Sequence, residues 1–102
     1  MAFVLSTMTY PNYKATELGK KYLELAKSPL PSYMKIAHIF ATTDPLYGIK
    51  GYVLYEIEDD KLFEGIKAIG KRMSTFRDIE GWKYNIEPLL EVKDALSLIG
   101  LA

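Results

Sequence analysis

His38 is the only histidine of the chain and the side chain that most readily moves a proton near neutral pH. It stands in an apolar segment, residues 34–43. If this segment lines an enclosed pocket, the imidazole could act as a general base toward an acidic C–H or a phenol. Glu56 stands in a second apolar segment, 50–57. If these segments are neighbouring strands, the two side chains could form an acid–base pair. His38 and Glu56 are therefore the candidate catalytic residues, and whether the chain is an enzyme stays open.

Both residues also have a structural interpretation. A half-buried His38 could be hydrogen-bonded across a subunit interface. A carboxylate on a partly buried face has a raised pKa unless it is paired, so Glu56 could instead form a salt bridge between subunits, with Lys35 or Lys83.

Aromatic side chains are the second chemical feature, because tyrosine is amphipathic and suits both pocket walls and subunit interfaces. There are eight tyrosines, and we expect Tyr52 and Tyr84 to lie nearest a cavity. Phe40 and Leu54 complete the expected ligand-binding set. The alternative is that these residues, like Trp82, only fill a core.

Charge and composition exclude several classes of site. The chain has no cysteine, so thiolate metal sites, iron–sulfur clusters and cysteine nucleophiles are absent. A single histidine with scattered carboxylates matches no zinc spacing, and we expect no metal and no cofactor. Lys71, Arg72 and Arg77 cluster near the end of a predicted helix, where they form either a solvated helix end or an anion site.

Nucleic-acid binding is disfavoured, since 13 basic and 13 acidic residues give a net charge of zero. The segment 50–57, KGYVLYEI, nevertheless matches part of an RNA-recognition strand motif through Lys50, Gly51 and Tyr52. The N-terminus lacks the features of a signal peptide, and no apolar run is long enough to span a bilayer. We therefore expect a cytoplasmic protein that is not bound to a membrane.

The elements that must position these residues follow from periodicity and turn chemistry. Apolar and β-branched stretches predict four strands, at 2–10, 34–43, 50–57 and 82–90. Apolar residues at three- and four-residue steps predict helices after Asn12, a plausible N-cap, and after Asp59 and Asp60. A short helix is expected at 92–99, ended by Gly100. Pro88 places the last strand at an edge or at its end.

This order, β-α-β-β-α-β with a tail helix, is the ferredoxin-like α+β pattern over residues 1–102, one domain. It puts the first and third strands in the centre of a four-stranded antiparallel sheet, with two helices on one face. Alternation assigns Ala37, Ala41, Val53, Tyr55 and Ile57 to the helix side.

The other face of the sheet would then carry a largely apolar set: Ile36, His38, Phe40, Tyr52, Leu54 and Glu56, with Phe3 and Leu5. A patch of this kind needs a partner, and a second copy of the same sheet is the simplest one.

The element order, the segment GYVLYEIED and the tail YNIEPLLEVKDAL resemble the dimeric α+β barrel superfamily, and within it small stand-alone proteins of unassigned function. The resemblance covers nearly the whole chain. It implies two sheets closing into a barrel across a homodimer, with a cavity inside the barrel or between sheet and helices. It carries no catalytic residue over, because no catalytic motif of the enzymes in that superfamily is recognisable.

Three functions remain open. The first is a homodimer, or a higher oligomer, that binds or transforms a small hydrophobic or aromatic molecule without a metal cofactor. The second is an oligomerisation or interaction module with no active site. The third is an RNA-binding ferredoxin-like domain, which would be a monomer with Phe3 and Tyr52 exposed.

Overall fold

The computed structural model describes residues 1–101. Its strands and α-helices are β1 (Ala2–Tyr10), α1 (Ala15–Ala26), β2 (Met34–Asp44), β3 (Gly48–Ile57), α2 (Leu62–Met73), β4 (Lys83–Leu89) and α3 (Val92–Leu98). Single 3₁₀ turns precede α1 (Asn12–Lys14), precede α2 (Asp59–Lys61) and follow it (Ser74–Phe76). The predicted ferredoxin-like βαββαβ order with a short C-terminal helix is confirmed.

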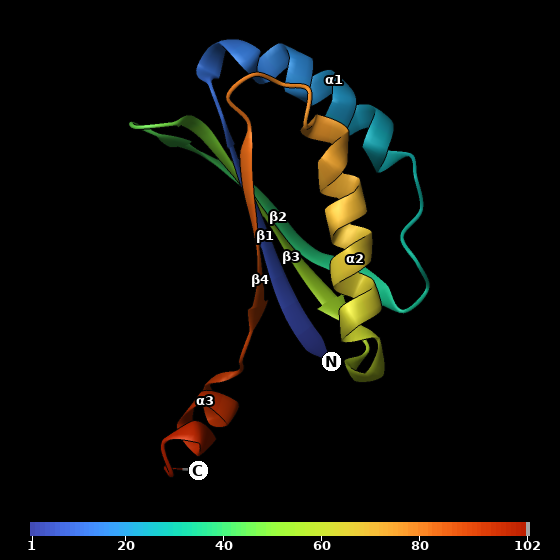
Figure 1. Ribbon diagram of the computed structural model, residues 1–102, viewed down its shortest axis with the longest axis vertical. Coiled ribbons are helices and arrows are strands. Elements are labelled where there is room, and N and C mark those ends of the chain that lie inside the picture. Colours follow the sequence, from blue (N-terminus) through green and yellow to red (C-terminus); the bar gives the residue numbers. More distant parts are fainter. Residues whose placement is uncertain (102) are drawn as a thin grey trace.

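The four strands form one antiparallel sheet in the order β2-β3-β1-β4. β1 and β3 occupy the centre as predicted, and β4, which contains Pro88, is an edge strand. Both long helices cover the same face of the sheet (Figure 1). α2 runs along the strands, whereas α1 crosses one end of the layer, so the β2–β3 hairpin extends beyond the helices.

The starts of the two long helices differ from the sequence prediction. Neither Asn12 nor the pair Asp59 and Asp60 caps a helix through its side chain. Each helix is instead entered through a 3₁₀ turn, and Pro11, which has no N–H to satisfy, occupies the cap position of the first. Asp59 pairs with the amino group of Met1 at 3.3 Å.

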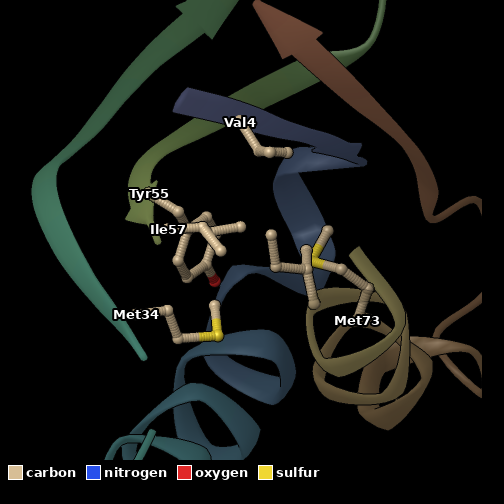
Figure 2. Packing of buried hydrophobic residues seen from close by; sticks show 6 residues of the cluster. Val4, Met34, Tyr55, Ile57 and Met73 are labelled. Atoms are coloured by element: carbon tan, nitrogen blue, oxygen red, sulfur yellow. The ribbon is translucent and has the colours of Figure 1, made fainter. Parts of the chain in front are cut away.

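The core between sheet and helices has two parts. The larger lies beneath α2 and comprises Val4, Met34, Tyr55, Ile57, Ile69 and Met73 (Figure 2). The smaller lies at the α1 end and comprises Tyr10, Leu18, Phe76 and Ile79. Met8 and Trp82 pack against both parts, and the Trp82 indole N–H donates to Met8 Sδ at 3.4 Å.

A β-bulge in β2 corrects one face assignment. Ile36 pairs with Tyr55 and His38 pairs with Leu54, which leaves Ala37 as the extra residue between them. The bulge reverses the phase of alternation, so Ile36 lies on the helix side with Tyr55 rather than on the other face. Beyond the bulge the predicted assignment holds, since His38 and Phe40 share the face of Leu54 and Tyr52.

The C-terminal arm, residues 90–101, leaves the edge of the sheet and carries α3 away from the two long helices (Figure 1). α3 ends before Gly100, which adopts φ 77°, as the sequence predicts. The arm exposes five large apolar side chains: Leu90, Val92, Leu98, Ile99 and Leu101. Within residues 1–101 no helix is long and apolar enough to cross a membrane.

Candidate functional site

The side of the sheet that faces away from α1 and α2, here called the open face, has an apolar centre and charged ends. Its central side chains are Leu5, Thr7, His38, Phe40, Tyr52 and Leu54, with Asn85 and Glu87 at the β4 edge. Phe3, Lys35, Glu56 and Leu89 lie toward the end of the sheet where β1 begins, and Lys50, Lys83, Thr9 and Thr42 lie toward the other end. Five of the six predicted site residues lie on this face.

The predicted pair His38 and Glu56 shares the open face without meeting. His38 is opposite Leu54 in the register and stacks on Phe40, with ring centroids 5.6 Å apart. Glu56 is opposite Lys35, and Lys35 Nζ lies 3.4 Å from Glu56 Oε2. Lys35 is thus the ion partner of Glu56, and the pair forms within one chain rather than between subunits.

The two tyrosines that we expected at one cavity lie on opposite sides of the sheet. Tyr52 is on the open face, where Lys50 Nζ stands 5.2 Å from its ring centroid. Tyr84 pairs with Met8 in the register and is therefore on the helix side, where its ring stacks on Trp82 with centroids 4.8 Å apart. Tyr84 is about half exposed, at 53%. The structure therefore does not bring the two rings into one site.

One concavity of the helix side lies between α1 and the β2–β3 hairpin, and we call it the α1 groove. It consists of two adjoining hollows of about 260 and 360 Å³ that share Met8, Tyr22, Ile39, Val53 and Met73. Ser6 lines the first hollow, and Tyr55 and Arg72 line the second. The combined size is in the range of small-molecule sites.

Polar groups gather at the inner end of this mainly apolar groove. Ser6 is 1% exposed and its hydroxyl has no hydrogen-bond partner within the described residues. The Tyr55 ring extends from β3 toward the helices (Figure 2), and burial raises the pKa of its phenol. The Arg72 charge and the polar atoms of Arg72 and Ser6 near the phenol lower that pKa in part, although the Ser6 hydroxyl does not reach full hydrogen-bond geometry with Tyr55. Three polar side chains therefore converge on one place.

Arg72 joins this cluster from α2. Its Nη1 donates to the backbone oxygen of Ser28 at 3.3 Å, a hydrogen bond that links α2 to the loop after α1. Its Nε is buried and has no partner in residues 1–101, and no carboxylate of that range lies within 4.0 Å of the guanidinium. Lys71 and Arg77, its companions in the predicted basic cluster, are exposed.

Gly19 keeps the groove open from the α1 side. It lines the first hollow, and a Cβ built on it would meet nothing within 4 Å. Because Gly19 lines the hollow, a larger side chain here is expected to occupy part of it. The groove thus depends on a position that has no side chain.

Sequence reasoning missed Ser6 and Tyr22 and placed Arg72 only at a helix end. One available signal was Ser6 itself, a hydroxyl between Val4 and Met8 on the apolar face of a central strand. Such a group is expected to have a partner when it is buried. Within the described residues there is also no group of three or more His, Asp or Glu side chains that could hold a metal ion.

Comparison with known proteins supports the fold and assigns no family. No protein-family model matches the chain, and no curated protein sequence matches it. Among solved structures, the chain is similar to part of a formyltetrahydrofolate deformylase from Pseudomonas putida KT2440, with a TM-score of 0.50, 11% identity and coverage of 99% of this chain and 39% of that one.

Two further structures share the fold. Aminopeptidase PepT from Bacillus cereus ATCC 10987 is similar with a TM-score of 0.50, 14% identity and coverage of 97% of this chain and 35% of that one. The de novo designed protein Foldit4 is similar with a TM-score of 0.50, 10% identity and coverage of 88% of this chain and 96% of that one. The chain thus spans less than half of each of the two enzymes.

Proposed function

We propose that this protein binds a small amphipathic molecule in the α1 groove. The observation that carries the proposal is the coincidence of an open apolar groove with two buried polar atoms, Ser6 Oγ and Arg72 Nε, that have no hydrogen-bond partner among residues 1–101. Ligand sites combine an apolar lining with a few convergent polar groups. A buried polar atom without a partner costs about 1–3 kcal/mol, and a ligand that satisfies it recovers part of that cost.

The proposal is tested by NMR titration with a neutral aromatic probe, 4-phenylbutanamide. The methyl groups of Met8 and Met73 line the groove, whereas Met34 belongs to the core and lines neither hollow. We expect saturable shifts of the Met8 and Met73 methyl signals and a much smaller shift of Met34. Shifts confined to Leu54 and His38 would place the probe on the open face and contradict the proposal.

A pair of substitutions at Gly19 isolates the groove. Gly19→Leu places a large side chain at the first hollow. Gly19→Ala is the control, because it also raises the helix propensity but adds only a methyl group. We expect Gly19→Leu to weaken binding of the probe at least tenfold and Gly19→Ala to leave it within about twofold. Equal binding by both variants would show that the groove is not the site.

A second proposed function, homodimerisation through the open face, rests on a separate observation. The apolar centre of this face lies between an end that holds the Lys35–Glu56 ion pair and an end that holds Lys50 and Lys83, and Glu87 stands opposite Leu5 at the β4 edge. A twofold axis perpendicular to the strands would turn the half of one sheet that holds Glu87, a carboxylate without an ion pair among residues 1–101, toward Lys50 and Lys83 of its partner. Isologous dimers need a self-complementary patch of this kind. Two sheets stacked in this way would form the dimeric α+β barrel.

Analytical ultracentrifugation tests this arrangement. Leu54→Lys buries a charge at the apolar centre and should convert the dimer to a monomer. Lys50→Glu removes the complementarity and should weaken the dimer at least fivefold, whereas the same change on the outer surface of α2, Lys67→Glu, should have no effect. A wild-type protein that is monomeric at about 100 μM would contradict the dimer, whatever the variants do.

A further inference from the structure

We infer that the ligand of the α1 groove carries a carboxylate, held by the side chains of Arg72, Ser6 and Tyr55, with its apolar part lying beneath α1. This inference rests on the proposed function, because it names the class of molecule for the same groove. The three side chains come from three different elements, α2, β1 and β3, so the fold and not a local motif assembles them.

All three side chains can donate hydrogen bonds toward the groove. Serine and tyrosine hydroxyls each offer one O–H, and a guanidinium offers several N–H groups and accepts none. Arg72 has the largest unused donor capacity of the three. Its Nη1 donates to the backbone oxygen of Ser28, whereas its buried Nε has no partner within residues 1–101. A ligand at this place must therefore present acceptor atoms.

The charge of the groove favours an anion over a neutral acceptor. None of the residues that line either hollow is an aspartate or a glutamate. Arg72 is the one charged residue in the two linings, so its positive charge is not balanced there. A bound anion would pair with this charge, which has no carboxylate within 4.0 Å among residues 1–101, through charge-assisted hydrogen bonds.

One guanidinium in an apolar groove favours a monoanion over a dianion. A carboxylate carries a single negative charge and matches the planar fork of arginine through two parallel hydrogen bonds. A phosphate monoester carries nearly two charges and would bring a second one into the groove without a partner. The remaining lining, which includes Met8, Val53 and Met73, suits an aliphatic or aromatic body.

Isothermal titration with two probes of nearly equal shape tests the inference. 4-Phenylbutanoate and 4-phenylbutanamide share the same body and differ in the charge of the head group. We expect the wild-type protein to bind the carboxylate at least tenfold more tightly than the amide at pH 7. Arg72→Gln should reduce this preference to less than twofold, while Lys71→Gln, the same change at the exposed neighbour, should preserve it.

Ser6→Ala provides a second variant that does not depend on the link between Arg72 and Ser28. It should reduce the preference for the carboxylate about threefold, because one donor is lost. If both probes bind equally well and Gly19→Leu abolishes the binding of both, the inference of a carboxylate ligand is wrong and the proposed function still holds. A preference that persists in Arg72→Gln would also overturn the inference. Binding of neither probe would overturn both.

Discussion

The two long helices cover the same face of the sheet in opposite ways, and a glycine in each shows the difference. Gly65 of α2 is buried, and a Cβ at this position would collide with Ile57 and lie 2.9 Å from its Cγ2. Gly19 of α1 also faces inward, and a Cβ there would meet nothing within 4 Å. One glycine permits close packing and the other maintains a space.

The apolar stripes of the helices account for this contrast. α2 buries Gly65, Ile69 and Met73 along the strands, and Ile69 and Ile57 are both 0% exposed. α1 buries only Leu18 and crosses the end of the layer, where the β2–β3 hairpin extends past it. One half of the helix side therefore serves stability, and the other half retains room for a ligand. Under the proposed function, this division is the one expected of a less stable binding region beside a rigid core.

Two isoleucine truncations should separate these halves most clearly. Ile69→Ala leaves a cavity in the packed half and should lower the free energy of unfolding by about 4 kcal/mol. Ile39→Ala removes the same atoms from a side chain that lines the groove and is 47% exposed, so it should cost only about 1 kcal/mol. Urea denaturation measures both values. Similar costs would mean that the groove closes in solution.

Replacing the two glycines with leucine tests the same contrast between the packed and the open half by adding side-chain volume instead of removing it. Gly65→Leu forces the fully buried Ile57 to move, and we expect a loss of about 3 kcal/mol from overpacking. Gly19→Leu meets open space and improves helix propensity, so it should raise stability by up to about 1 kcal/mol. The same denaturation experiment distinguishes them, and a loss at Gly19 as large as that at Gly65 would contradict an open groove.

The fold was predictable because periodicity and turn chemistry agree along the chain. The strand from Ala2 to Tyr10 and the hairpin around Pro45 have the expected limits to within two residues, and the four-three spacing in α2 marks its buried side. The error at Ile36 has one cause. A bulge inserts a residue without altering composition, so alternation carried through Ala37 assigns the residues before it to the wrong face.

The candidate site was less predictable, because it depends on spaces and not on residue types. His38 and Glu56 attracted interest through their chemistry, yet the register sets Leu54 opposite one and Lys35 opposite the other. The angle at which α1 crosses the sheet, which creates the groove, is not encoded in a local pattern. Ser6 and Arg72 are 66 positions apart in the sequence and converge only through that packing.

Ser6→Ala should show that the groove half carries a cost for stability. The buried Ser6 hydroxyl has no hydrogen-bond partner in the part of the chain that the structure describes, and truncation to alanine removes the cost of burying it. We expect a gain of about 1 kcal/mol in the free energy of unfolding of the ligand-free protein. Thermal unfolding with and without 4-phenylbutanoate measures it. A destabilised variant would indicate that an ordered water already satisfies Ser6.

Tyr55 lies where the two halves meet, and its titration gives the smallest predicted effect. Burial raises its pKa above 10.0, so the folded protein keeps a phenolic proton that the unfolded chain releases. The resulting stability is fully present below pH 10 and is lost as the pH rises through the folded pKa. Phenylalanine cannot ionise at this position. As the pH rises from 7 to 10.5, Tyr55→Phe should therefore lose less free energy of unfolding than the wild type, by at most about 0.8 kcal/mol.

Urea denaturation of the wild type and of Tyr55→Phe between pH 7 and 10.5 measures this difference in the loss of stability. Saturation with 4-phenylbutanoate should increase it, because a carboxylate beside the Tyr55 hydroxyl opposes phenolate formation. If the probe leaves this difference unchanged, the carboxylate does not lie beside the Tyr55 hydroxyl. The alkaline behaviour of one buried phenol thus reports on the packed half in the free protein and on the open half in the complex.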